Sequence, residues 1–125
     1  MVPETPVRNY RDLLIWQKAM ALVEDVYVIT RGFPTDEKFG LTSQVRRAAV
    51  SVPSNIAEGH TRQHDNELRR FLYIALGSLA ELDTQLELSV RLGYVAPEGL
   101  REITEDALGL RKMMFGLIVR LRTTH

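Results

Sequence analysis

Apolar side chains recur every three or four residues over four long stretches of the chain, the spacing that places them on one face of an α-helix. The predicted helices run from about Asp12 to Ile29, from Thr35–Asp36 to Gly59, from Asp65 to Leu92, and from Pro97 onward. No segment alternates with period two, so no sheet is expected. Short links between long amphipathic helices predict an all-α protein, an antiparallel up-and-down four-helix bundle. Residues 1–125 form a single domain in this prediction, with residues 1–9 as an extended N-terminal arm.

The periodicity also predicts the core face of each helix. On the first helix this face holds Leu13, Trp16, Met20, Val23 and Tyr27. On the second it holds Leu41, Val45, Ala48, Val52 and Ile56, and on the third Leu68, Leu72, Ala75, Leu79, Leu82 and Leu86. The fourth helix carries an unbroken seam of the coiled-coil type at Leu100, Ile103, Ala107, Leu110, Met114, Leu117 and Leu121.

A proline, Pro53, lies inside the second predicted helix. A proline there removes one backbone hydrogen bond and clashes with the preceding turn, at a cost of roughly 3 kcal/mol. The apolar register continues from Val45 to Ile56 across it, so the prediction is a kink that does not end the helix. Gly77, inside the third helix, costs about 1 kcal/mol relative to alanine, which predicts a packing reason for it.

Two polar stripes lie directly beside the apolar faces of the second and third helices. Placed at 100° per residue, they predict a polar network where the two helices meet, or an oligomer interface. The alternative is that both stripes are solvated edges. Within the network, Arg47 and Glu81 are candidates for a charge-assisted hydrogen bond, and Asn55 is a candidate to satisfy backbone groups freed by Pro53. The residues are Gln44, Arg47, Ser51, Asn55 and Glu58 on the second helix, and Ser78, Glu81 and Gln85 on the third.

These same segments carry a family resemblance. The patterns FPxDExxGLTSQxRRAxxSxPxNIAEG (33–59) and FLxIAxGSLxELxTQL (71–86) resemble the four-helix bundle proteins of the S23 type. Those proteins are named for reading frames in intervening sequences of bacterial 23S ribosomal RNA genes. The resemblance implies a left-handed bundle and a homopentamer, with no established enzymatic activity. Accessory proteins of diversity-generating retroelements are similar in fold, but they are basic, whereas this chain has a formal net charge of zero.

Balanced charge also bears on function, because a nucleic-acid binder is normally basic. Arginine clusters still offer a candidate phosphate-binding surface in an assembled oligomer, since the guanidinium fork suits bidentate contacts. The alternative is that these arginines pair with neighbouring acids or cap helix ends. The candidates are Arg46, Arg62, Arg69, Arg70, Arg120 and Arg122.

Catalytic and metal-binding signatures are missing from the sequence. The chain has no cysteine, no glycine-rich phosphate loop and no evident serine–histidine–aspartate set. His60 and His64 fall in a predicted turn, where their spacing does not favour a metal, and the pairs Glu24–Asp25 and Glu105–Asp106 are interpreted as solvated helix faces. No catalytic residue, metal site or cofactor is predicted. No apolar run reaches membrane-spanning length, so a cytoplasmic protein without a membrane partner is expected.

Two hypotheses of function follow. The first is a non-enzymatic, homo-oligomeric helical scaffold or interaction protein, whose main partner is a further copy of itself. The second is an accessory protein that binds nucleic acid, or a nucleic-acid enzyme, through the arginine clusters. The balanced charge favours the first.

Overall fold

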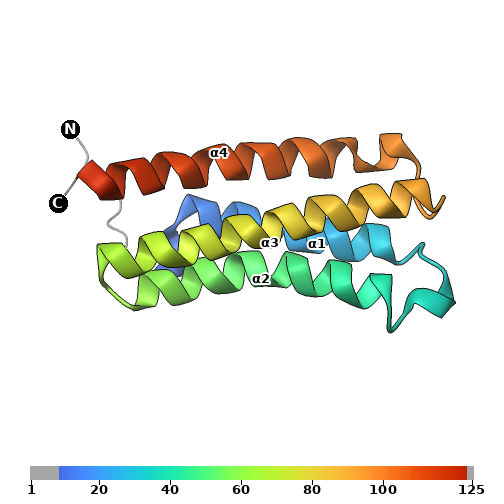
Figure 1. The fold of residues 1–125 in the computed structure, drawn as a ribbon, viewed down its shortest axis with the longest axis horizontal. Helices are drawn as coiled ribbons and strands as arrows, with labels where there is room; N and C mark the ends of the chain where they lie inside the picture. The colour runs from blue at the N-terminus through green and yellow to red at the C-terminus, as the bar shows by residue number, and fades with distance from the viewer. Residues whose placement is uncertain (1–8, 124–125) are drawn as a thin grey trace.

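Four long helices pack side by side in the computed structural model, which describes residues 9–123, and no strand occurs in that range (Figure 1). They are α1 (Leu14–Thr30), α2 (Leu41–Thr61), α3 (Asp65–Arg91) and α4 (Arg101–Thr123). Three short 3₁₀ turns flank them: η1 (Tyr10–Asp12), η2 (Thr35–Glu37) and η3 (Pro97–Leu100). Each helix packs mainly against two neighbours, so α1 and α3 occupy diagonal corners. The predicted four-helix bundle is confirmed. Apart from Asn9, the expected N-terminal arm lies outside the described residues.

The core faces of α2, α3 and α4 are close to those predicted. Every predicted position of α2 is buried, as are those of α3 except the partly buried Leu68. On α4, Leu121 is buried as predicted, but Ile118 is buried in place of Leu117, which packs at the edge of the core. The helix drifts relative to a strict seven-residue repeat, which accounts for this one-residue shift.

The predicted core face of α1 is wrong. The buried residues are Ile15, Ala19, Leu22, Val26 and Thr30. Trp16 and Val23 pack at the edge of the core, while Met20 and Tyr27 are exposed. This helix is apolar around most of its circumference, so its period fits two neighbouring faces equally well. The positions of α2 and α4 decide between them.

Pro53 lies inside α2 without ending it, as predicted, and its side chain is buried. It lines a hollow between α1 and α2 together with Trp16 and Val23. The missing donor leaves the carbonyl of Ala49 without its usual partner. Asn55 does not replace that donor, because its Nδ2 donates to the Ser51 carbonyl at 2.8 Å.

The turn from α2 to α3 depends on one glycine. A Cβ added at Gly59 would lie 2.6 Å from the Cβ of Phe71 and 3.4 Å from the Cα of Leu68. These atoms are backbone or close to it, so they cannot move aside without shifting a helix. The corresponding expectation for Gly77 is not met within one chain, because a Cβ there would meet nothing within 4 Å.

The other end of the bundle is held by a hydrogen-bonded carboxylate. Glu37 accepts a bond from the Leu41 backbone N–H at 3.0 Å, which caps α2, and another from the Tyr94 hydroxyl at 2.7 Å. The Tyr94 ring also packs against Phe33, with ring centroids 5.6 Å apart. The loop between α1 and α2 is thereby joined to the loop that follows α3. Gly40 leaves room for this cap, since a Cβ there would lie 2.6 Å from Glu37 Oε1.

The loop after α3 takes a defined conformation as well. Gly93 has a φ of +80°, and its N–H donates to the Val90 carbonyl at 3.0 Å. The Tyr94 N–H donates to the Ser89 carbonyl at 2.9 Å, which completes a Schellman motif. Gly93 thus caps the C-terminus of α3, and the loop places Tyr94 against Glu37.

Gly59→Ala is expected to destabilise the protein by about 1–3 kcal/mol, the usual cost of overpacking a close helix contact. Gly109→Ala on α4 is the matched control, because a Cβ there meets nothing within 4 Å. That control should be neutral or stabilising by up to about 1 kcal/mol. Urea unfolding at fixed protein concentration measures both, and equal effects would contradict the close approach of α2 and α3.

Tyr94→Phe is expected to destabilise the protein at neutral pH and much less at pH 3. The Leu41 and Tyr94 hydrogen bonds lower the pKa of Glu37 below its usual value of 4.5. A lowered pKa contributes stability above about pH 4.5, and this is lost as the pH falls through the folded-state pKa. The same bond raises the pKa of Tyr94 above 10.0, so that contribution is lost only at strongly alkaline pH. Unfolding of Tyr94→Phe and of the exposed control Tyr73→Phe at both pH values tests this. An unchanged deficit at pH 3 would contradict it.

Candidate interaction surface between α2 and α3

The two predicted polar stripes meet in one groove. Six of the eight predicted residues line a hollow of about 360 Å³ between α2 and α3, with Ala48 as the seventh lining residue. The six are Gln44, Arg47, Ser51, Ser78, Glu81 and Gln85. The stripes therefore lie beside each other, as the prediction of a network or interface requires. We call this hollow the α2–α3 groove.

A chain of hydrogen bonds closes the base of the groove. Asn55 Nδ2 donates to Ser51 Oγ at 2.9 Å, and Ser51 Oγ lies 2.8 Å from Ser78 Oγ. Ser78 Oγ donates to the Ile74 carbonyl at 3.3 Å, so the Ser51 hydroxyl donates to Ser78. Ser78 is buried. Because each hydroxyl donates to the next acceptor in this chain of hydrogen bonds, both can lie between packed helices without an unsatisfied donor. For these three side chains, the predicted network between helices is present.

The rest of the groove is not internally paired. Arg47 and Glu81 are exposed and form no ion pair or hydrogen bond with each other or with any other described residue. The expected charge-assisted bond between them is therefore absent in the single chain. Gln85 is half-buried, and its Oε1 is fully shielded from solvent without a hydrogen-bond partner in the described part of the chain. The groove retains one cation, one anion and two amides, those of Gln44 and Gln85, with unused hydrogen-bonding capacity.

Glu58, the remaining predicted network residue, turns toward the α2–α3 turn instead. It forms an ion pair with Arg62 at 3.1 Å, four residues along the helix. Arg62 also approaches Glu67 at 3.6 Å, and Arg70 Nε donates to Glu67 at 2.9 Å. The Arg70 hydrogen bond is the main reason that the pKa of Glu67 is lowered, and the same bond raises the pKa of Arg70.

Aromatic contacts complete the arginine cluster at this turn. The guanidinium groups of Arg62 and Arg70 lie over the Phe71 ring at 5.2 and 4.5 Å. Arg69 bonds to the side chain of Asn66 at 2.9 Å. All three predicted phosphate-binding arginines of the turn therefore have polar partners within the chain. This agrees with the alternative interpretation, in which arginines pair with neighbouring acids.

The other candidate arginines lie elsewhere. Arg120 and Arg122 are exposed on the last turn of α4. Arg46 is half-buried against α1: its Nε donates to Thr30 Oγ1 at 2.8 Å, and its guanidinium lies 4.5 Å from the Tyr27 ring centroid. Thr30 is itself buried and donates to the Val26 carbonyl at 2.8 Å. Arg46 thus joins α1 to α2 and faces away from the groove.

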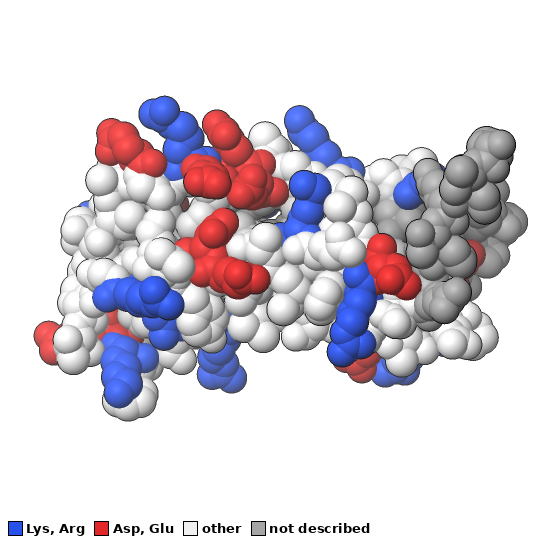
Figure 2. All heavy atoms as spheres, turned by 180° about the vertical axis from the view of Figure 1, so that it is seen from behind, with Lys and Arg blue, Asp and Glu red and all other residues white. Residues whose placement is uncertain are grey.

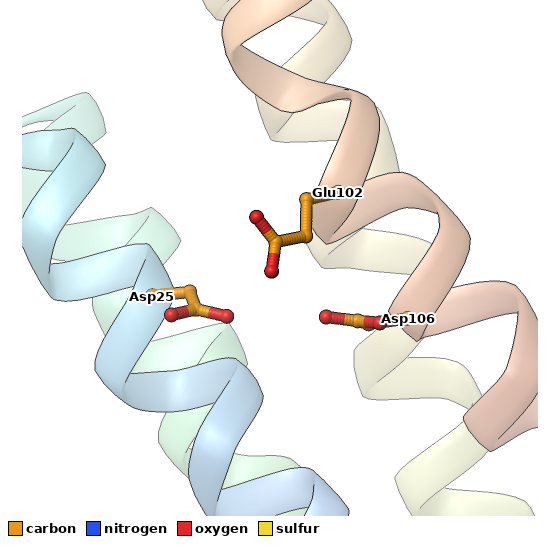
Figure 3. Close-up of side chains that lie close together, drawn as sticks. All are labelled: Asp25, Glu102 and Asp106. Atoms are coloured by element: carbon orange, nitrogen blue, oxygen red, sulfur yellow. The ribbon is translucent and has the colours of Figure 1, made fainter.

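A carboxylate cluster on the opposite side of the bundle was missed by the sequence analysis. Asp25 of α1 points toward Glu102 and Asp106 of α4 (Figure 3), and one oxygen from each lies within 4.8 Å of the others. Acidic side chains gather on this face over α1 and α4, with basic side chains around them (Figure 2). Glu102 and Asp106 are exposed, and Asp25 is half-buried. The four-residue spacing of Glu102 and Asp106 indicates that these two acids share one face of a helix. The contact between α1 and α4 that adds Asp25 could not be predicted from the sequence.

Within residues 9–123, this is the one group of at least three histidine or acidic residues close enough to hold a metal ion. His60 and His64 are not part of it. Exposed acids of this kind are common on helical surfaces, and water screens their repulsion. No helix in the described range is long and apolar enough to cross a membrane.

Arg46→Ala should destabilise the folded chain by about 1–2 kcal/mol, because it removes a hydrogen bond to a buried hydroxyl and a cation–π contact. Arg47→Ala should change the unfolding free energy of the isolated chain by less than about 0.5 kcal/mol, since Arg47 has no partner there. Denaturant titrations at low protein concentration compare the two. A larger loss for Arg47→Ala in the dissociated chain would contradict the described contacts.

Comparison with known proteins agrees with this fold. A family profile described as "23S rRNA-intervening sequence protein" matches residues 11–116. No match is found among curated proteins. The chain is similar to a crystal structure of a protein with unknown function from the S23 ribosomal protein family of Bacteroides thetaiotaomicron. The TM-score is 0.74 with 24% sequence identity, covering 84% of this chain and 98% of the other. That likeness supports the fold, and the profile match extends over most of the sequence. The chain belongs to the 23S rRNA-intervening sequence protein family.

Proposed function

We propose that this protein is a non-enzymatic helical scaffold that associates with copies of itself. The observation that carries the proposal is the set of large apolar side chains left exposed along the helices. Leu14 and Val28 of α1, Ile74 and Leu88 of α3, and Phe115 of α4 all project from the bundle. Such residues on several faces of a small bundle are typical of surfaces that pack against another protein.

The polar groove supports the same proposal. Arg47, Glu81 and Gln85 keep unused hydrogen-bonding capacity at the edge of an otherwise well-packed helix pair. Of these groups, only the Oε1 atom of Gln85 is buried without a partner, which is uncommon in folded proteins and calls for an explanation. A second protein seated on the groove provides one. None of the clusters described above has the nucleophile, base and orienting group that a catalytic site needs.

Nucleic-acid binding is the weaker candidate. Arg62 and Arg70 at the α2–α3 turn pair with Glu58 and Glu67, so phosphate would have to compete there with carboxylates already in place. The net charge of zero provides no general attraction for a polyanion. A cytoplasmic location belongs to the scaffold proposal and agrees with the absence of cysteine from the sequence.

The expected oligomer is a homopentamer, as the family resemblance implies. Multi-angle light scattering at micromolar concentration should give a mass of about five times 14.3 kDa, the mass of one chain. A different multiple would correct the number of copies. A mass of one chain across the accessible concentration range would overturn the scaffold proposal.

A further inference from the structure

We propose that the α2–α3 groove receives helix α1 of a second copy of this chain, parallel to α3. The inference rests on the proposed self-association and names the surfaces that carry it. Two residue sets define these surfaces. The α3 stripe is Ile74, Ser78, Glu81, Gln85 and Leu88, and the α1 stripe is Leu14, Gln17, Ala21, Glu24 and Val28.

The α3 stripe has the spacing of a coiled-coil seam. Its members alternate four and three residues apart, so they follow one line along α3. The two ends are apolar and exposed, Ile74 at 41% and Leu88 at 44%. The centre is polar and forms one wall of the groove. A helix laid along this line would bury both apolar ends, and the polar centre would set its register.

The α1 stripe has the matching layout. Its members alternate three and four residues apart, and all five are exposed. The ends are again apolar, Leu14 at 54% and Val28 at 58% exposure, while the small Ala21 at the centre permits close approach. The apolar ends lie 14 positions apart on both stripes, which is about 21 Å along a helix at a rise of 1.5 Å per residue. Leu14 can therefore pack on Ile74 while Val28 packs on Leu88.

Charge complementarity favours the parallel direction of the incoming helix, because the antiparallel register would place Glu24 opposite Ser78, farther along the groove from Arg47. The Ser51–Ser78 hydrogen bond shows that these two residues lie at the same position along the bundle axis. Because the two helices are antiparallel, Arg47 lies about one turn along α3 from Ser78, near Leu82. A parallel α1 with Leu14 opposite Ile74 places Glu24 opposite position 84, within one turn of Arg47. Neither Glu24 nor Arg47 forms an ion pair with another described residue of its own chain.

The location of the two stripes determines what kind of assembly results. Since α1 and α3 occupy diagonal corners of the bundle, the α1 stripe and the groove face different sides. Two copies therefore cannot each place α1 in the groove of the other. Each copy instead contacts a different neighbour through each surface, and only a closed ring leaves no α1 stripe and no groove uncovered. The groove of each copy, including the unpartnered Gln85 amide, is then covered by its neighbour.

Disulfide cross-linking tests the contact directly, because the natural sequence has no cysteine. The Leu14→Cys/Ile74→Cys variant should form covalent multimers on mild oxidation, seen on a non-reducing gel, since a disulfide needs Cβ atoms about 3.5–4.5 Å apart. Leu14→Cys/Leu88→Cys is the matched control and should not cross-link. Cross-linking of the control alone would overturn the parallel direction. An absence of cross-links in both, in a preparation shown to be oligomeric, would overturn the surface assignment.

Charge reversal tests the pairing of Glu24 with Arg47. Glu24→Arg and Arg47→Glu should each raise the dissociation constant at least tenfold, and the double variant should recover most of that loss. Glu87→Arg is the control, because Glu87 lies on α3 outside the stripe and pairs with Arg91. Single variants that assemble normally, or a double variant that recovers nothing, would overturn the pairing. A separate outcome is a natural protein that is monomeric. That result would overturn the proposed function itself, whereas the results above test only the pairing.

Discussion

The close packing of α2 against α3 is the constraint on which the rest of this structure depends. Gly59 lets α3 turn back directly against α2, because a Cβ at that position would run into Phe71. Further along, Ser51 and Ser78 meet in a hydrogen bond of 2.8 Å, and Asn55 completes the chain. Buried hydroxyls in such a contact are favourable only when each donor is used. The two helices are thereby fixed in position relative to each other, and the side chains above the contact line one groove.

Pro53 and the polar stripe occupy different sides of the same helix. The proline is buried toward α1, where it lines a hollow with Trp16, while Ser51 and Asn55 face α3. One helix therefore contributes an apolar side to one neighbour and a hydrogen-bonding side to another. A similar division separates the arginines, since Arg46 binds α1 and Arg47 borders the groove. Adjacent residues in the sequence have separate roles because 100° per residue directs them to different neighbours.

Much of the fold could be predicted from the sequence because three of the four helices are clearly amphipathic. Part of the polar network could also be predicted, since Ser51 and Ser78 fall on matching edges of two antiparallel helices, but the expected Arg47–Glu81 bond is absent. The buried face of α1 could not, because Met20 and Ile15 both lie on apolar sides and only the neighbouring helices distinguish them. The cluster of Asp25 with α4 depends on the same tertiary contact. Glu58 bonds to Arg62 because a partner one turn away costs less ordering than one across the groove.

The features of this bundle that bear on function are charged, polar and apolar groups on its surface. Ion pairs join Glu58 to Arg62 near the α2–α3 turn and Asp83 to Arg111 between α3 and α4, while an acidic cluster lies over α1 and α4. Polar groups without partners border the α2–α3 groove, and exposed apolar residues lie on helices that face different sides. A rigid helix pair whose surface carries polar groups without partners is suited to assembly. The groove is already formed before a partner binds, so little ordering is needed on binding.

A double-mutant cycle between Ser51 and Ser78 tests the central constraint most directly. Unfolding free energies would be measured for the natural protein, Ser51→Ala, Ser78→Ala and the double variant, all at the same protein concentration. The packing described above predicts a coupling energy of about 1 kcal/mol between the two hydroxyls. Additivity of the two single changes within about 0.3 kcal/mol would contradict a structural hydrogen bond at the base of the groove.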